Sequence, residues 1–391
     1  MSVRQRVPRY AAAAALLVTL TGCGADTGSG AAGPSPATGS SSAAASTSPT
    51  GSPTGSPSTA SPSGTGSAGG PTGSPSSPTP LSASTHVLRW SAVPGPARDT
   101  TTRGGGWTLT VTGNGSGWTL DGPGTGRGGG ASGRKVSDAL LDQHWAVVVQ
   151  QDAHEARPSV AEVIDLRTGR RSAIDGGSDV PTTTGGSWTL AGDRLLHATY
   201  GPHRAYCVAT ADLSTGRSTL GWCAPPRHGF NGARIGSGGD SVMSFDAGRP
   251  SCRTLVAVDG SRGTPFPGVP PCTAWDGVRT TDGAVWSVVP NAHQVEAAHF
   301  YAHSGDRWLD LGPGSSGSLV WCGNAAWFGR DPQRDGDPAE LMRWSAADGL
   351  SVAYRSHGSR AFLSAPRCGG DTITVTAFTD AGDEQVSAPV G

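Results

Sequence analysis

Hydrophobic residues from about residue 86 onward fall in short runs, many of which alternate between apolar and polar positions. Four clear examples are Trp145–Val149, Val163–Leu166, Thr254–Val258 and Thr372–Phe378. Gly, Pro, Asp or Asn bounds each run, which is typical of strands joined by turns. The three- and four-residue spacing of an amphipathic helix is almost absent. The pattern therefore predicts an all-β domain over residues 86–391.

A tight turn recurs within this region at a regular interval. Four of its five copies place an Asp one to four residues before a Gly, as in Asp165-Leu-Arg-Thr-Gly-Arg170 and Asp212-Leu-Ser-Thr-Gly-Arg217, and the fifth is His303-Ser-Gly-Asp306. Such an Asp bonds its own backbone and the Gly accepts a positive φ, as a short hairpin loop requires. Intervals of 47, 47, 42 and 44 residues separate the turn glycines Gly169, Gly216, Gly263, Gly305 and Gly349.

A second turn marker, also rich in Gly and Asp, is predicted to separate the units. It occurs 40 to 50 residues apart, at Leu141–Gln143, Ala191–Asp193, Gly238–Asp240, Thr281–Gly283, Cys322–Asn324 and Gly369–Asp371. A period of this length with about four short strands fits one blade of a β-propeller. Residues 86–391 have room for about seven such units.

The two ends of the domain decide the blade count. Residues 104–133 are very rich in Gly and offer only two short strands, Trp107–Val111 and Trp118–Leu120, so six blades is the alternative to seven. The last unit, Thr372–Val390, has room for two strands. We expect the isolated strand His86–Trp90 to complete this blade and close the ring, which leaves no free edge there.

The first 22 residues have the plan of an export signal. Arg4, Arg6 and Arg9 precede an apolar run, Ala11–Leu20, which is about half the ~20 residues that span a bilayer. The segment ends in Leu20-Thr21-Gly22-Cys23, which resembles the lipobox of bacterial lipoproteins. That resemblance implies that Cys23 is acylated and becomes the new N-terminus, so that the membrane is a partner through a lipid anchor. An ordinary secretory signal with a chance Cys is the alternative.

Residues 23–85 are predicted to be a disordered tether. From Gly24 to Thr85 every residue except Asp26 and Leu81 is Gly, Ala, Ser, Thr or Pro, and such a composition cannot form a core. The domain organisation expected from the sequence is therefore a signal peptide (1–22), a tether (23–85) and a β-propeller (86–391). The chain would be exported and anchored to the outer face of the cell membrane.

The repeat itself also carries a resemblance. The Asp-Leu-x-Thr-Gly-Arg turn is similar to that of propellers in many exported actinobacterial lipoproteins, over roughly residues 136–378. These motifs specify hairpins only, and a propeller fold implies no particular function.

Six cysteines besides Cys23 suggest three disulfides in an exported domain. Cys207 and Cys223 flank the Asp212–Arg217 turn, and Cys252 and Cys272 flank the next one, so each pair is expected to face across a hairpin. Cys322 and Cys368 remain, and they are expected to join the entry of one blade to its exit. Zinc binding by these thiols is disfavoured because no Cys-x-x-Cys occurs.

Candidate ligand residues have plainer interpretations. His293, Glu296, His299 and His303 could suggest a metal cluster, but His299 and His303 would lie about 13 Å apart along one strand at ~3.3 Å per residue. Asp331, Asp335 and Asp337 offer oxygen ligands in an order unlike the EF-hand loop, so a solvated loop is favoured over calcium. We predict no metal site, no cofactor and no catalytic residue.

Most of the 12 tryptophans are expected between blades, but Trp222, Trp275 and Trp321, which lie near turns, could line a binding surface. Gly and Pro number 60 and 30, which excludes a helical bundle. The 29 basic residues balance 30 acidic ones, so nucleic acid is not an expected partner.

The sequence favours a non-enzymatic binding or interaction scaffold whose partner is an unidentified protein or cell-envelope ligand. No Gly-x-Ser-x-Gly or His-Glu-x-x-His motif occurs in residues 86–391. The alternative is a propeller enzyme (a lyase, a hydrolase or a quinone-dependent dehydrogenase) whose active site converges in the central channel. A purely structural wall-zone protein is a third possibility. Acidic or His residues with perturbed pKa values in the channel would favour the enzyme.

Overall fold

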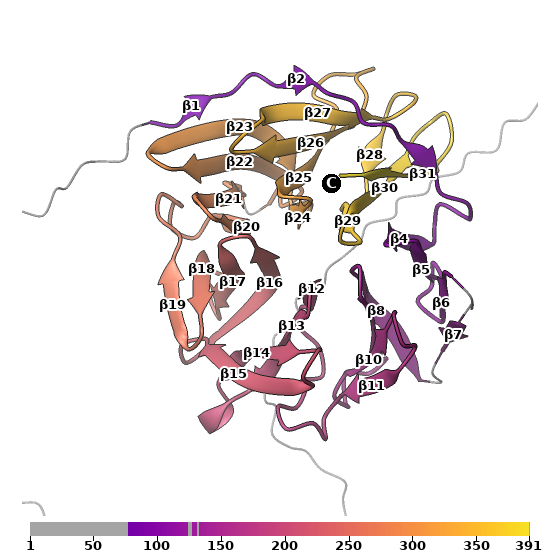
Figure 1. Cartoon of the computed structure of the whole chain (residues 1–391). Coiled ribbons are helices and arrows are strands. Elements are labelled where there is room, and N and C mark those ends of the chain that lie inside the picture. Colours follow the sequence, from indigo (N-terminus) through magenta and orange to yellow (C-terminus); the bar gives the residue numbers. More distant parts are fainter. Residues whose placement is uncertain (1–76, 124–126, 131–132, 292, 391) are drawn as a thin grey trace, which may run out of the picture. The chain divides into compact units, whose positions relative to one another are not determined.

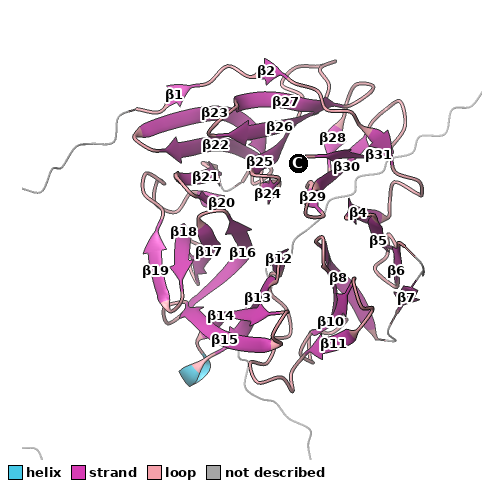
Figure 2. Ribbon diagram, viewed as in Figure 1, coloured by secondary structure: helices cyan, strands magenta, loops and turns pink. Residues whose placement is uncertain are grey.

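A computed structural model describes residues 77–123, 127–130, 133–291 and 293–390, and nearly all regular structure in them is β-strand (Figure 2). Seven sheets follow one another around a central axis (Figure 1). The domain is therefore a seven-bladed β-propeller, and the six-bladed alternative is wrong. The predicted signal segment, Cys23 and the tether up to residue 76 lie outside the described residues.

The first four blades each contain four consecutive antiparallel strands, numbered from the axis outward. Blade 1 has β4 (Thr100–Gly104), β5 (Trp107–Val111), β6 (Trp118–Asp121) and β7 (Arg127–Gly129). Blade 2 has β8 (Arg134–Leu141), β9 (Trp145–Asp152), β10 (Val160–Asp165) and β11 (Arg171–Ile174). Blade 3 has β12 (Thr189–Ala191), β13 (Arg194–Tyr200), β14 (Tyr206–Asp212) and β15 (Arg217–Cys223). Blade 4 has β16 (His228–Gly236), β17 (Gly239–Asp246), β18 (Arg253–Asp259) and β19 (Arg262–Pro265).

The last three blades each receive a strand from the N-terminal part of the chain. Blade 5 has β20 (Ala274–Thr280), β21 (Gly283–Val288), β22 (Ala297–Ser304), β23 (Arg307–Ser315) and β1 (Thr79–Pro80). Blade 6 has β24 (Val320–Cys322), β25 (Ala325–Arg330), β26 (Glu340–Ser345), β27 (Gly349–Arg355) and β2 (Ser84–Thr85). Blade 7 has β28 (Phe362–Leu363), β29 (Arg367–Cys368), β30 (Thr372–Phe378), β31 (Glu384–Pro389) and β3 (Ser91–Ala92).

Residues 79–93, here called the N-terminal belt, run along the outer edges of these three blades (Figure 1). β1 and β2 pair in parallel with β23 and β27, and β3 pairs antiparallel with β31. The N-terminal segment therefore closes blade 7, as expected, although the closing strand is Ser91–Ala92 rather than His86–Trp90. Residues 79–85, assigned above to the tether, are part of the propeller.

Four of the five predicted turn glycines have the expected positive φ; the exception is Gly263, which lies in β19, and Gly260 (φ +57°) occupies that turn instead. Asp212 accepts hydrogen bonds from the backbone N–H groups of Ser214 and Thr215, both at 3.0 Å, and Gly216 has φ +70°. The second marker does not separate blades, contrary to the expectation from the sequence. Residues 142–144, for example, join β8 to β9 inside blade 2. The hairpin between the two inner strands of a blade needs a tight turn, as does the hairpin between its two outer strands, so both turns carry similar residues.

The described apolar core consists of clusters that each join two neighbouring blades. The cluster between blades 5 and 6 contains the stacked rings of Phe300 and Phe328, whose centroids lie 4.1 Å apart. Other clusters fill the interfaces 1–2, 2–3, 3–4, 4–5 and 6–7. Among the described residues, no helix is long and apolar enough to cross a bilayer, and the one helical element is the short 3-10 turn Pro202–Arg204.

All three disulfides have the predicted pairing. Cys207–Cys223 crosses the last hairpin of blade 3, and Cys252–Cys272 spans the equivalent hairpin of blade 4. Cys322–Cys368 differs from the expectation in its role, because it joins the inner strands of two adjacent blades, β24 and β29, rather than the two ends of one blade.

Candidate functional site

A cavity of about 440 Å³ lies on the propeller axis. Its wall comes from the innermost strands of six blades, which contribute Thr102, residues 139–142, residues 188–191, Arg234 and Ile235, residues 317–324, residues 365–368 and Gly370. A volume in this range holds a small organic ligand. The cavity is the main candidate site in the described part of the chain.

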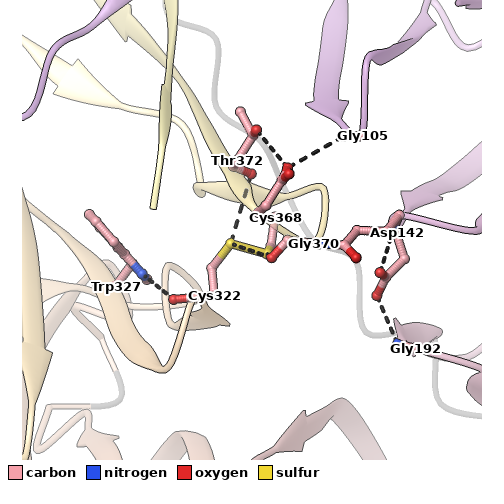
Figure 3. The surroundings of a disulfide bond; sticks show 10 residues. Gly105, Asp142, Gly192, Cys322, Trp327, Cys368, Gly370 and Thr372 are labelled. Atoms are coloured by element: carbon pink, nitrogen blue, oxygen red, sulfur yellow. Dashed lines mark hydrogen bonds between the residues drawn. A yellow bond between two sulfur atoms is a disulfide. The ribbon is translucent and has the colours of Figure 1, made fainter. Parts of the chain in front are cut away.

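Bonds between blades fix one end of this cavity (Figure 3). Asp142 of blade 2 accepts a hydrogen bond from the backbone N–H of Gly192 in blade 3 (2.8 Å), and Asp371 of blade 7 accepts one from Gly105 in blade 1 (3.3 Å). The Cys322–Cys368 disulfide joins blades 6 and 7 at the same end. These links make the wall a preorganised surface.

Arg234 and Asp276 form a charged pair across the inner strands of blades 4 and 5. The Nη2 atom of Arg234 lies 3.6 Å from Asp276 Oδ1, and its Nε donates to the carbonyl oxygen of Leu319 (3.0 Å). Asp276 also accepts hydrogen bonds from the Gly317 N–H (2.7 Å) and the Ser287 hydroxyl (3.2 Å). Burial raises the pKa of Asp276, and Arg234 opposes that shift.

Asp138 of β8 is a second carboxyl group in the electrostatic field of Arg234. Burial raises its pKa to about 6, although Ser137 and Arg234 both act to lower it. Asp138 and Asp276 have the perturbed pKa values that would favour an enzyme, but neither lines the cavity. Asp138 precedes the wall residue Ala139, and Asp276 contacts the wall residues Arg234 and Gly317. Sequence reasoning missed both, because they lie in different blades and share no local motif.

Arg367 of β29 is the other arginine in the cavity wall. Its Nε donates to the carbonyl oxygen of Thr101 (2.7 Å), and its Nη2 lies 3.4 Å from the Thr376 hydroxyl. Burial lowers its pKa to about 10. One sequence signal could have indicated Arg367. It directly precedes Cys368, which the disulfide pattern places at the boundary of a blade.

The tryptophans singled out from the sequence have different surroundings. Trp321 lines the cavity, as a binding residue would. Trp222 is buried in the core between blades 3 and 4. Trp275 packs against the core between blades 5 and 6, and the guanidinium of Arg253 lies 4.6 Å from its ring centre. The interpretation as a binding surface therefore fits Trp321 alone of the three.

The candidate metal ligands lie away from the cavity. His299 and His303 are half-buried on β22, where His299 Nε2 lies 2.6 Å from Asp310 and the ring of His303 contacts Trp308. His293 and Glu296 are exposed in the preceding loop. Asp331 accepts a hydrogen bond from the Ser315 hydroxyl (2.8 Å), and Asp335 and Asp337 lie beyond it in the loop before β26. In the described part of the chain, no three His, Cys, Asp or Glu residues are placed to share a metal ion.

Comparisons with known proteins support the fold alone. No protein-family model matches the chain, and no curated protein matches it. The propeller domain of the Trilobed protease from Pyrococcus furiosus is similar in structure, with a TM-score of 0.52 at 8% identity over 74% of this chain and 95% of that one. A prolyl endopeptidase structure has a TM-score of 0.51 at 14% identity, over 77% of this chain and 47% of that one. The chain thus spans about half the length of that endopeptidase.

Proposed function

We propose that this protein is an exported, lipid-anchored β-propeller that acts as a binding scaffold and holds its ligand in the central cavity. The observation that carries the proposal is the preorganised cavity of about 440 Å³ on the axis. Hydrogen bonds and a disulfide between blades hold its wall in place, so little ordering cost is incurred on binding.

Two carboxylates, Asp142 in the cavity wall and Asp276 in contact with the wall residues Arg234 and Gly317, support binding rather than chemistry. Asp142 is bonded to backbone N–H groups of Gln143 and Gly192, and Asp276 to Gly317 and Ser287. These carboxylates hold the inner strands together. A catalytic carboxylate would instead face the reacting atoms.

A variant that fills the cavity tests this proposal. Ala365 is exposed in the cavity wall, and Ala365→Trp would occupy the space with little effect on the blades. The full chain and this variant are compared by thermal unfolding with sugars, peptidoglycan fragments, quinones, and divalent metals with a chelator control. A ligand of the cavity raises the Tm of the unmodified chain only. Equal shifts in both chains, or none in either, would contradict the proposal.

The lipid anchor is tested separately in producing cells. Metabolic labelling with an alkyne fatty acid should mark the chain, and Cys23→Ser should abolish the label and release the protein into the medium. The other six cysteines are paired in disulfides, so they offer no competing thiol. Cys23→Ser protein that keeps the label or stays with the membrane would contradict anchoring at this residue.

Asp138 favours a second candidate function, a propeller enzyme with acid–base chemistry in the channel. A carboxyl group with a pKa of about 6 can exchange a proton near neutral pH. The full chain is assayed against uronate, glycoside, ester and peptide substrates between pH 5 and 8. Turnover that follows an ionisation near pH 6 and disappears in Asp138→Asn would support the enzyme, whereas turnover unaffected by this substitution would exclude Asp138 from catalysis.

A further inference from the structure

The interface between blades 7 and 1, here called the seam, differs from the others. Each of the other six interfaces contains an apolar cluster, whereas no described cluster joins blade 7 to blade 1. The backbones instead approach closely, since a Cβ on Gly104 would lie 1.7 Å from the carbonyl oxygen of Gly369. Polar side chains fill the rest of the seam, namely Thr101, Arg103, Arg367, Thr374, Thr376, Gln385 and Ser387.

The two arginines of the seam have no acidic partner among the described residues. Arg103 Nη1 donates to the Ser387 hydroxyl (3.2 Å), and Arg367 bonds to Thr101 and Thr376. Arg234, across the cavity, is by contrast paired with Asp276. A half-buried guanidinium without a counter-charge is costly, which is why such groups usually pair with an anion.

Arg367 differs from Arg103 because it lines the cavity. Its Nη1 makes no hydrogen bond to the described residues, so it has donor capacity left for a ligand. Asp142, the acidic residue of the cavity wall, forms no ion pair with Arg367, and its hydrogen bonds come from the backbone N–H groups of Gln143 and Gly192. The lowered pKa of Arg367 reflects burial without a compensating charge.

The surroundings of Arg367 define the kind of anion. Trp321 and Ala365 are apolar residues of the same cavity wall whose side chains are accessible. A planar guanidinium matches the geometry of a carboxylate, and a single unpaired cation balances a single negative charge. The ligand should therefore combine one carboxylate with an apolar body.

We propose that the central cavity binds an organic monocarboxylate, with its carboxylate on Arg367 and its apolar body against Trp321 and Ala365. The inference rests on the proposed function, in that it assigns a ligand class to the same cavity. The carboxylate of the ligand supplies the counter-charge that Arg367 lacks among the described residues.

Titration calorimetry on the full chain tests the assignment with phenylacetate as the probe. Phenylacetamide controls for the charge, acetate for the apolar body and inorganic phosphate for the type of anion. Arg367→Gln should weaken phenylacetate binding at least about tenfold, because a charge-assisted bond is lost. The matched variant Arg103→Gln removes the other seam arginine outside the cavity and should change the Kd less than about twofold. Circular dichroism checks that Arg367→Gln is folded. If it is not, Arg367→Lys, which keeps the charge, replaces it in the test, and this variant should bind phenylacetate with intermediate affinity.

Several outcomes would overturn the inference. These are equal binding of phenylacetamide, tighter binding of phosphate, no binding of phenylacetate, and an Arg367→Gln or Arg367→Lys affinity equal to that of the unmodified chain. Ala365→Trp separates the two proposals. If this substitution abolishes phenylacetate binding while Arg367→Gln does not, the cavity is a binding site and only the role of Arg367 fails. If neither substitution changes binding, the cavity is not the site.

Discussion

Trp90 joins the N-terminal belt to the propeller through a hydrogen bond and an aromatic contact. Its indole Nε1 donates to the carbonyl oxygen of Ala353 in β27 (2.8 Å), and its ring meets Tyr354 edge-on with centroids 5.1 Å apart. The hydrogen bond contributes about 1 kcal/mol. The aromatic pair contributes about 1 kcal/mol, and the half-buried apolar surface of the ring about 1 kcal/mol more. Trp90→Ala should therefore lower the free energy of belt opening by about 3 kcal/mol, or about a hundredfold in the opening equilibrium.

Amide hydrogen exchange reads this opening directly. The N–H groups of His86 and Leu88 donate to the carbonyl oxygens of Val352 and Ala353, so they exchange only when the belt leaves β27. In Trp90→Ala both should exchange about a hundredfold faster, while the buried amide of Val147 in blade 2 keeps its rate. Trp90→Phe keeps a ring against Tyr354 and loses the indole bond, so it should give about a fivefold increase.

The reasoning fails if Trp90→Ala and Trp90→Phe accelerate His86 and Leu88 equally, because the ring contact would then contribute nothing. It also fails if Val147 accelerates to the same extent as the belt amides. In that case the belt would open only together with the whole propeller, and Trp90 would contribute to global stability rather than to local docking.

Two further predictions concern the channel wall. The entropy of loop closure at a separation of 46 residues predicts that the Cys322–Cys368 bridge stabilises the fold by about 4 kcal/mol, against about 3 kcal/mol for Cys207–Cys223 at 16 residues. In urea unfolding, replacing Cys322 and Cys368 by Ala should therefore lower the free energy of unfolding more than replacing Cys207 and Cys223. The reverse order would contradict this model. Asp138 has a raised pKa in the folded state, so the folded chain holds a proton that the unfolded chain releases as pH rises from about 4 to 6. The stabilisation from this proton is thus fully present well below pH 4 and is lost as pH rises through about 6. Asp138→Asn should be more stable than the unmodified chain at pH 7.5, by at most about 3 kcal/mol, and the difference should shrink to nearly zero at about pH 3. A constant difference between the two chains across this range, measured by urea unfolding, would exclude a shifted Asp138.

The fold could be predicted because its signals are local. The Asp165 and Asp212 turns repeat at blade intervals, which favoured seven blades over six, and cysteines flank two of these hairpins. Two disulfide pairs therefore followed from spacing, and the third was the pair that remained. The belt could not be predicted. β1 and β2 use backbone hydrogen bonds in two-residue stretches rich in Ser, Thr and Pro, and a segment of that composition has no apolar pattern to distinguish it from a tether.

The candidate site could not be predicted from the sequence for a different reason. Asp138, Arg234, Asp276 and Arg367 come from four blades, and each sits on an inner strand whose neighbours are ordinary. Their relation appears only when the ring brings these strands to one axis. Trp321 was a candidate because it lies near a turn, but the same argument included Trp222, which is buried in the core.

The polar seam also has a consequence for how the ring closes. Blades 1 and 7 come from opposite ends of the domain, so contacts across their interface have the greatest sequence separation in the ring, and we expect them to form late in folding. An apolar interface would stay exposed until then and would favour aggregation. Thr101, Thr376 and Ser387 stay hydrated while the ring is open, and only six residues, 94–99, separate the belt from β4 of blade 1. Docking of the belt therefore places blade 1 next to blade 7, so the seam needs no apolar cluster to hold the two blades together. Arg367 can then face the cavity.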